Sequence, residues 1–144
     1  MLVSQILKSK ADEGVLTIQA GATVGEAART LSERRIGSLV VSEDGKRADG
    51  IISERDIVRE IGRRGAGCLQ ESVGSMMTRN LVTCTRGDLA DGVLVTMTNG
   101  RFRHLPVVEG GELVGLISIG DVVKARLSEL SMEKDALEGM IKGF

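Results

Sequence analysis

The stretch GLISIGDVV, from Gly115 to Val123, has a close copy in the same chain, GIISERDIV, from Gly50 to Val58. Each copy reads as an apolar run, a serine, two variable residues, an aspartate and an apolar pair. The two aspartates, Asp56 and Asp121, lie 65 positions apart (121 minus 56). A repeat of this period predicts two copies of one supersecondary unit, because a unit that cannot cover its own apolar face packs against a second one.

The match extends upstream of these motifs. GSLVV at 37–41 corresponds to RHLPV at 103–107, one position out of step, because the loop that follows is slightly longer in the first half. VLTI at 15–18 resembles LVTC at 81–84. The similarity therefore covers nearly the whole of each half.

Hydrophobic periodicity and turn residues predict the order β-α-β-β-α in each half. In the first half we expect strands over 15–19, 37–41 and 49–52, a turn at 43–46, a helix from the capping box of Thr23 and Glu26 to about Arg34, and a second helix from Ser53. In the second half we expect strands over 81–84, 104–108 and 113–117, a turn at 109–112, a helix from Asp88 to about Thr98 stopped by Asn99-Gly100, and a second helix from Ser118.

These elements predict a mixed α+β fold, in which two repeats pack with pseudo-two-fold symmetry and a helical extension follows. The expected boundaries are repeat 1 at 1–61, a linker at 62–72, repeat 2 at 73–130 and the extension at 131–144. Short apolar segments at 3–7 and 73–77 fit terminal pieces packed onto the pair of repeats. GRRGAG in the linker lacks the glycine spacing of a phosphate-binding loop and follows no strand.

The composition excludes several classes of function. A hydrophobic content of 42% and a charged content of 27% favour a globular chain, and a net charge of -1 gives no basic surface for nucleic acid. The chain has no Trp or Tyr, so a stacking platform for single strands is disfavoured. The apolar runs are too short to cross a membrane, and we expect a cytoplasmic protein. Cys68 and Cys84 form no CxxC pair, which indicates reduced, small hydrophobic residues.

The residues also argue against an enzyme. His104 is the only histidine, so a multi-histidine metal site and a serine or cysteine triad are disfavoured. Turnover of a nucleotide that disappears when Asp56 or Asp121 is replaced would overturn this interpretation.

The Ser-x-x-Asp motif of each copy allows two interpretations. The structural one is a capping box, in which Ser53 or Ser118 caps a helix and the aspartate three residues later completes the box, worth about 1 kcal/mol. The functional one is a binding site, because helix N-terminal amides at the end of a strand attract anions and a carboxylate accepts hydrogen bonds from ribose hydroxyls. Both roles are compatible with the same residues.

Two β-α-β-β-α repeats that each end in G-[LI]-I-[ST]-x-x-D, with RHLPVV in the second, resemble a tandem pair of CBS (cystathionine β-synthase) domains, also called a Bateman module. The resemblance runs from Val3 to about Leu127, and the chain is similar to small stand-alone bacterial proteins built only from this module. It implies a regulatory sensor that binds adenosyl compounds such as AMP, ADP, ATP, NAD or S-adenosylmethionine in the cleft between the repeats. No cofactor is required, and the protein that this sensor regulates is unknown.

The resemblance also implies which residues contact the ligand. Arg55 could reach a phosphate, but Gly120 stands at the matching place, so the second site would use Arg101, Arg103 or His104 instead. The first repeat has Gly37-Ser38 in place of Arg103-His104 and Val40 opposite Pro106, which weakens the case for a phosphate clamp there. The implied ligand-binding residues are Thr17, Gly37, Ser38, Leu39, Ser53, Arg55, Asp56, Thr83, Arg103, His104, Leu105, Pro106, Ser118 and Asp121.

Val123, Leu127, Leu130, Leu137 and Ile141 recur at three- and four-residue spacing in the C-terminal extension, with Lys134 interrupting. The extension is either a helix packed on its own module or one that pairs with a second subunit. CBS pairs usually dimerise through helices, so the resemblance favours a homodimer. The alternative to the sensor is an assembly module that has lost its ligand and dimerises without nucleotide.

Overall fold

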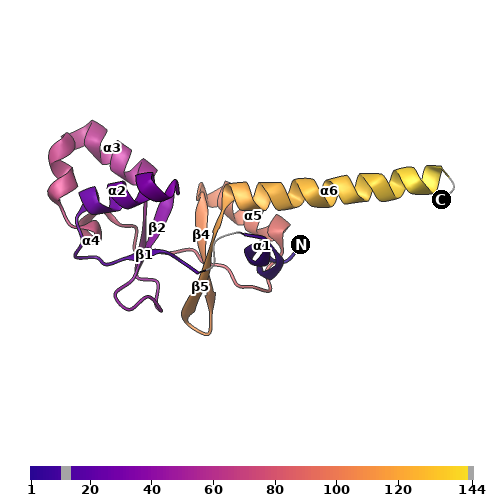
Figure 1. Cartoon of the computed structure of the whole chain (residues 1–144), viewed down its shortest axis with the longest axis horizontal. Helices are drawn as coiled ribbons and strands as arrows, with labels where there is room; N and C mark the ends of the chain where they lie inside the picture. The colour runs from indigo at the N-terminus through magenta and orange to yellow at the C-terminus, as the bar shows by residue number, and fades with distance from the viewer. Residues whose placement is uncertain (11–13, 143–144) are drawn as a thin grey trace. The chain divides into compact units, whose positions relative to one another are not determined.

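The computed structural model describes residues 1–10 and 14–142. Contacts divide the chain into two compact units, and each unit combines segments that are far apart in sequence. The first unit consists of Met1–Glu13, Cys84–Leu105 and Ile117–Phe144, and the second of Gly14–Thr83 and Pro106–Leu116. Figure 1 labels the helices and strands.

The second unit contains a three-stranded sheet in the order β1-β2-β3. Strand β1 (Thr17–Ile18) pairs parallel to β2 (Ser38–Val41), which pairs antiparallel to β3 (Gly50–Ser53). The register places Ser38 opposite Ser53 and Leu39 opposite Ile52. Three α-helices and a short 3₁₀-helix complete the unit, namely α2 (Val24–Arg34), α3 (Glu54–Arg64), α4 (Val73–Met76) and η1 (Ala66–Gln70).

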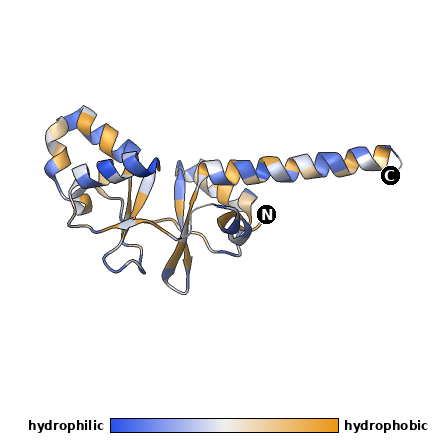
Figure 2. Cartoon of the chain, in the orientation of Figure 1, coloured by the Kyte–Doolittle hydropathy of each residue, from blue (hydrophilic) through white to orange (hydrophobic). Residues whose placement is uncertain are grey.

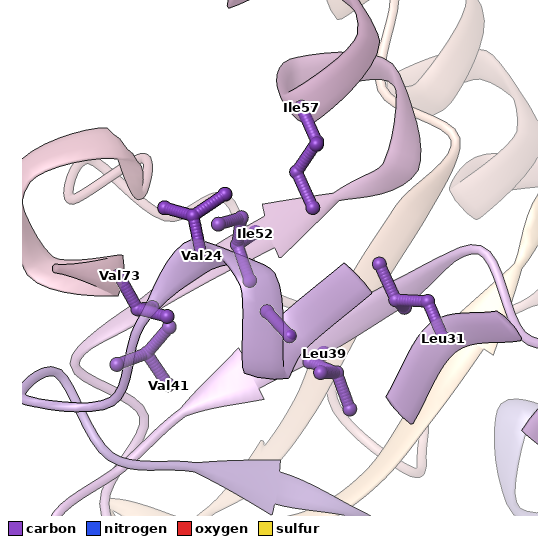
Figure 3. Packing of buried hydrophobic residues seen from close by; sticks show 8 residues of the cluster. Val24, Leu31, Leu39, Val41, Ile52, Ile57 and Val73 are labelled. Carbon is purple, nitrogen blue, oxygen red and sulfur yellow. The ribbon is translucent and has the colours of Figure 1, made fainter. Parts of the chain in front are cut away.

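The core of the second unit lies between α2 and the sheet, as Figure 3 shows. Apolar side chains of α2 meet side chains of β2 and β3, and Ile57 of α3 and Val73 of α4 join them. Burial of these side chains is the main source of stability here, at roughly 1.5–3 kcal/mol for each fully buried aliphatic residue. The buried cluster consists of Val24, Ala27, Leu31, Leu39, Val41, Ile52, Ile57 and Val73.

Helix α2 begins where its capping box was predicted. The Glu26 N–H donates to Thr23 Oγ1 at 3.1 Å, and the Thr23 N–H donates to Glu26 Oε2 at 3.4 Å. The helix ends at Arg35, which adopts a left-handed conformation with φ 54°. Because its termini are defined by local hydrogen bonds, the extent of this helix was readable from the sequence.

Gly50, the first residue of the repeated motif, is required by a close backbone approach. Ile51 and Thr78 exchange backbone hydrogen bonds of 3.0 and 2.9 Å beside it. A Cβ at position 50 would lie 2.6 Å from Met77 Sδ and 2.9 Å from the Thr78 carbonyl oxygen. The glycine therefore allows the chain after α4 to pack against β3.

Among the described residues, the helices of the first unit are α1 (Val3–Ser9), α5 (Ala90–Gly100) and α6 (Ile119–Ile141). The Val3 N–H donates to the Asp88 carbonyl at 2.9 Å, and Leu2 forms an isolated bridge with Leu89. The N-terminal helix thus packs with helices of the second half of the sequence. Its buried side chains, with those of α5 and α6, are Val3, Ile6, Ala90, Val93, Met97, Val122 and Ala125.

Strands β4 (His104–Glu109) and β5 (Glu112–Ser118) form a two-stranded sheet whose residues divide between the two units. Gly110 and Gly111 both have positive φ, 56° and 82°. A two-residue hairpin turn of type I′ needs positive φ at both central positions, and glycine adopts it without strain. The predicted turn is therefore confirmed.

Two predicted elements of the second half are wrong in detail. Residues 81–84 form no strand; only Cys84 makes an isolated bridge, and the Leu81 N–H turns back to the Arg79 carbonyl. Val82 and Thr83 are both exposed, so the segment lacks the alternating burial of a strand. Helix α5 also begins two residues later than predicted, because Asp88 Oδ2 accepts the Thr85 N–H in the preceding turn.

Helix α5 continues through Asn99 and Gly100, which were predicted to stop it. Arg101 ends the helix instead, in a left-handed conformation with φ 58°. Gly100 has a packing role, because a Cβ there would clash with the ring of Phe102. The glycine therefore accommodates an aromatic ring rather than a change of backbone direction.

Candidate ligand-binding site

Both Ser-x-x-Asp motifs form complete capping boxes. At α3, the Asp56 N–H donates to Ser53 Oγ at 3.2 Å and the Ser53 N–H donates to Asp56 Oδ2 at 3.0 Å. At α6, the corresponding distances for Ser118 and Asp121 are 3.1 and 2.9 Å. The capping interpretation is confirmed, and each carboxylate is held at the first turn of a helix that directly follows a strand.

A repeated backbone hydrogen bond precedes each box. The Glu54 N–H donates to the Gly37 carbonyl at 2.9 Å, and the Ile119 N–H donates to the Arg103 carbonyl at 2.8 Å. These pairs match under the repeat, with the one-position offset that the alignment of the two halves requires. The first amide of each helix is therefore bonded to the residue just before a strand, which is β2 in the first copy and β4 in the second.

The two carboxylates have different cationic partners. Asp56 Oδ1 accepts a hydrogen bond of 2.9 Å from Arg59 of the same helix. Asp121 Oδ2 lies 2.9 Å from Lys10 Nζ, which comes from the segment after α1. Nothing in the local sequence pattern indicated Lys10, whereas Arg59 at three residues from Asp56 is a readable helical pair.

The Asp121 carboxyl is acidic compared with a free side chain. Burial, the largest single influence, raises its pKa, but hydrogen bonds from the Ser118 N–H and from Lys10, with the charge of Lys10, together outweigh burial and leave the pKa below its ordinary value of 3.8. Asp121 is therefore ionised at neutral pH, as an acceptor of ribose hydroxyl hydrogen bonds must be.

Ser38 combines deep burial with an unsatisfied polar group. Its side chain is 2% exposed, and its Oγ has no hydrogen-bond partner within the described part of the chain. Residues opposite each other in a sheet project from the same face, so the Ser38 and Ser53 side chains are neighbours. A hydroxyl without a partner thus lies beside the N-terminus of α3, and an orphan of this kind costs about 1–3 kcal/mol.

The other residues predicted to contact the ligand differ in their exposure to solvent. Leu39, Leu105 and Pro106 are buried, and Thr17 is half-buried beside Val40 in the sheet. Arg55, Thr83 and Arg103 are exposed, while His104 is half-buried at the start of β4.

The two units divide the predicted residues. The second unit holds Thr17, Gly37, Ser38, Leu39, Ser53, Arg55, Asp56, Thr83 and Pro106, and the first holds Arg103, His104, Leu105, Ser118 and Asp121. That these two sets line one cleft stays a prediction.

A surface hollow of about 480 Å³ lies elsewhere in the second unit. The Asp44 carboxylate holds the loop itself, since Asp44 Oδ1 accepts the N–H groups of Lys46 and Arg47 at 2.8 and 3.0 Å. Those hydrogen bonds lower the pKa of Asp44. The hollow contains none of the predicted contact residues, and its lining is Glu43, Asp44, Lys46, Arg47, Asp49, Gly110, Gly111 and Glu112.

Cys68 and Cys84 are buried free thiols, and burial raises the pKa of the Cys84 thiol to about 11 with a smaller contribution from Asp88. Across residues 1–10 and 14–142, no three His, Cys, Asp or Glu side chains gather as a metal site would need. No helix in those ranges has the length and apolarity to span a membrane.

Comparison with known proteins shows which family has this repeat and this fold. The family model for the CBS domain matches residues 3–63 and again 73–128. The chain belongs to the CBS-domain family. It contains two copies of the domain, as the resemblance of its repeats had implied, and the mixed α+β fold predicted for such a pair is confirmed.

Solved CBS structures share this fold. The CBS-domain protein ATU1752 from Agrobacterium tumefaciens is 44% identical, with a TM-score of 0.83 over 88% of this chain and 99% of that one. A putative signal-transduction protein with CBS domains from Burkholderia ambifaria is 35% identical, with a TM-score of 0.83 over 89% of this chain and 95% of that one.

Curated relatives include longer proteins. The mitochondrial CBS domain-containing protein CBSX3 of Arabidopsis thaliana is 34% identical over 98% of this chain and 72% of its own length. The CBS domain-containing protein CBSCBSPB2 of the same plant is 36% identical, but the match spans only 23% of its length. The CBS pair thus occurs both as most of a protein and as a small part of one.

Proposed function

We propose that this protein is a non-catalytic regulatory module that binds an adenosyl ligand, AMP, ADP, ATP or NAD, through the residues around its two Ser-x-x-Asp motifs. The observation that carries the proposal is the repetition of one arrangement at α3 and α6. In both copies a helix follows a strand directly, and a carboxylate is fixed in its first turn. Such a carboxylate suits a ribose, and the neighbouring helix amides suit a phosphate.

The fold is compatible with this ligand class. The CBS-domain pair of protein MJ0100 was solved in complex with 5-methylthioadenosine and S-adenosyl-L-methionine. It is 23% identical to this chain with a TM-score of 0.78, so the likeness concerns the fold alone. It supports the class of ligand without identifying contact residues in this protein.

Regulation requires that the ligand bind two states of the module with different affinity. A partner protein would read the change of state. We further propose that the module acts as a homodimer, because α6 carries exposed apolar residues along most of its length.

Ligand binding is tested by thermal shift with AMP, ADP, ATP, NAD and S-adenosylmethionine. A ligand at 100 times its Kd should add about 2.7 kcal/mol to the free energy of unfolding. Asp56→Asn and Asp121→Asn keep an oxygen that can accept the capping hydrogen bond, and we expect each to weaken binding at least tenfold. Asp135→Asn on the exposed end of α6 is the matched control. No shift with any of the five ligands at millimolar concentration would contradict the proposal.

A second candidate function is a ligand-free assembly module. It is favoured by the fact that Asp56 already uses both carboxylate oxygens, one for its cap and one for Arg59. This candidate predicts a dimer that purifies without absorbance at 260 nm, which is easily measured because the chain has no Trp or Tyr. Nucleotide that co-purifies, identified by mass spectrometry, would reject it.

A further inference from the structure

Helix α6 carries an apolar stripe that its own unit leaves uncovered. The stripe consists of Val123, Leu127, Leu130, Leu137 and Ile141, with Lys134 in the gap, and we call it the outer stripe. These positions are separated by four, three, four, three and four residues, which places them on one face of an α-helix. Their apolar members are 40%, 63%, 49%, 59% and 85% exposed.

The outer stripe is not a continuation of the face that packs in the core. The buried residues of α6 are Val122 and Ala125, at 0% and 6% exposure. At about 100° per residue, these two lie roughly 100–160° around the helix from the middle of the stripe. Figure 1 shows α6 running on past α1 and α5, and Figure 2 shows apolar residues recurring along it. One face of the helix is thus buried in its unit, and a second, apolar face is not covered by any of the described residues.

The charges beside the stripe indicate what covers it. Lys124 and Arg126 flank its N-terminal part, and Glu133 and Glu138 flank its C-terminal part. A second α6 that runs antiparallel brings Lys124 of each copy beside Glu138 of the other. The charges along α6 therefore complement those of a second α6 that runs in the opposite direction. Opposite charges at such flanking positions determine which helices pair and in which direction.

Lys134 distinguishes the two possible directions. In a parallel pair, Lys134 faces Lys134 of the second copy, and Glu133 faces Glu138, so like charges meet at both places. In an antiparallel pair, Lys134 lies opposite Leu130 of the second copy and close to its Glu133. Its long aliphatic stem can then cover the leucine while the ammonium offsets the two Glu133 carboxylates near the two-fold axis.

We propose that the outer stripe pairs antiparallel with the same stripe of a second copy of this chain, in a register set by Lys134. Leu127 then packs against Leu137 of the second copy, and Val123 against Ile141. The arrangement is a closed two-fold interface, in which each contact occurs twice. The proposal deepens the self-association part of the proposed function and rests on that part, but it does not depend on nucleotide binding.

Two variants with equal starting exposure test the interface. Leu127 on the stripe and Met132 on the opposite side of α6 are both 63% exposed. We expect Leu127→Glu to raise the dissociation constant of the dimer at least 100-fold in sedimentation equilibrium. Met132→Glu should leave it within about threefold. Equal effects of the two variants, or a monomeric wild type, would overturn the proposal.

Cysteine cross-linking tests the direction. Val123→Cys and Ile141→Cys proteins are oxidised separately and after mixing under exchange conditions, with the wild type as control for Cys68 and Cys84. We expect a disulfide-linked dimer only in the mixture. Cross-linking of either variant alone indicates parallel pairing and overturns the register, and an absence of cross-links in the mixture overturns the contact.

Thermal shift of Leu127→Glu with the adenosyl ligands separates the two proposals. A ligand response that is kept while the dimer is lost supports independent binding and assembly. An intact α6 dimer without any ligand response would leave the interface standing and reject the sensor.

Discussion

The Ser38 hydroxyl is buried without a hydrogen-bond partner in the described structure, and this predicts the effect of removing it. Without ligand, Ser38→Ala should leave the free energy of unfolding unchanged or raise it by up to about 1 kcal/mol, because no hydrogen bond is lost. If the hydroxyl contacts the ligand, affinity should fall about three- to tenfold, as one hydrogen bond is worth about 0.5–1.5 kcal/mol. Urea unfolding and calorimetric titration measure the two quantities.

The control for this prediction is Ser53→Ala on the facing strand. That change removes the cap of α3 and should lower the free energy of unfolding by about 1 kcal/mol. A similar loss in ligand-free Ser38→Ala would mean that the hydroxyl has a structural role after all.

The ion pair of Asp121 and Lys10 predicts a pH dependence. The pKa of Asp121 is lowered in the folded protein, so the unfolded chain binds more protons as pH falls past the ordinary value of 3.8. The stabilisation is therefore complete above about pH 5 and is lost as pH falls below 3.8 toward the folded pKa. The difference in unfolding free energy between wild type and Lys10→Met should follow this course.

Lys8→Met serves as the reference for that measurement, since Lys8 is an exposed residue of α1. The difference in unfolding free energy between Lys8→Met and the wild type should stay constant between pH 3 and pH 7. If the difference in unfolding free energy for Lys10→Met were also independent of pH, the ion pair would contribute nothing to stability in solution.

At the scale of single elements, the end of α2 gives a matched pair of variants. Arg35 occupies a left-handed position with φ 54°, which glycine adopts more readily than arginine. We expect Arg35→Gly to raise the free energy of unfolding by about 0.5–1 kcal/mol. Arg34→Gly, one residue earlier in the last helical turn, should lower it by about the same amount. Chemical denaturation of both variants tests this, and a loss of stability in Arg35→Gly would contradict it.

Helices that begin with a Thr-x-x-Glu or Ser-x-x-Asp capping box were predictable from sequence, and the others were not. Thr23, Ser53 and Ser118 each accept the amide three residues on, so α2, α3 and α6 begin where the motifs indicate. Helix α5 has Leu89 at its N-cap and no side-chain cap, so the nearby Asp88 suggested a start two residues too early.

The candidate site was predictable to a similar degree. The paired motifs predicted where Ser53, Asp56, Ser118 and Asp121 lie at the helix starts, because the repeat and the cap chemistry are local. Their contact with a ligand stays a prediction. Lys10 escaped prediction because an ion pair between residues 111 positions apart leaves no spacing in the sequence. The sequence also could not show that the Ser38 hydroxyl lacks a hydrogen-bond partner, because this depends on which residues of the folded chain lie near it.

At the scale of the whole molecule, spatial units and sequence repeats do not coincide. Helix α1 precedes the first repeat's sheet in sequence, but it packs with α5 and α6 in the first unit. Helix α4 follows the linker, yet it packs with α2 and β3 in the second unit. Each unit therefore contains a segment from the other half of the sequence.

This exchange predicts where a core mutation acts. Ile6 in α1 is 2% exposed, and Ile6→Ala should lower the free energy of unfolding by about 2–4 kcal/mol, because the cavity forms in a packed interior. Hydrogen exchange should speed up in α5 and α6, not in α2 and β2, although the latter are nearer in sequence. Ile57→Ala in α3, at 4% exposure, is the counterpart and should speed exchange in α2 and β2. If Ile6→Ala instead loosened α2 and β2 first, α1 would belong with its neighbours in sequence and the division into these units would be wrong.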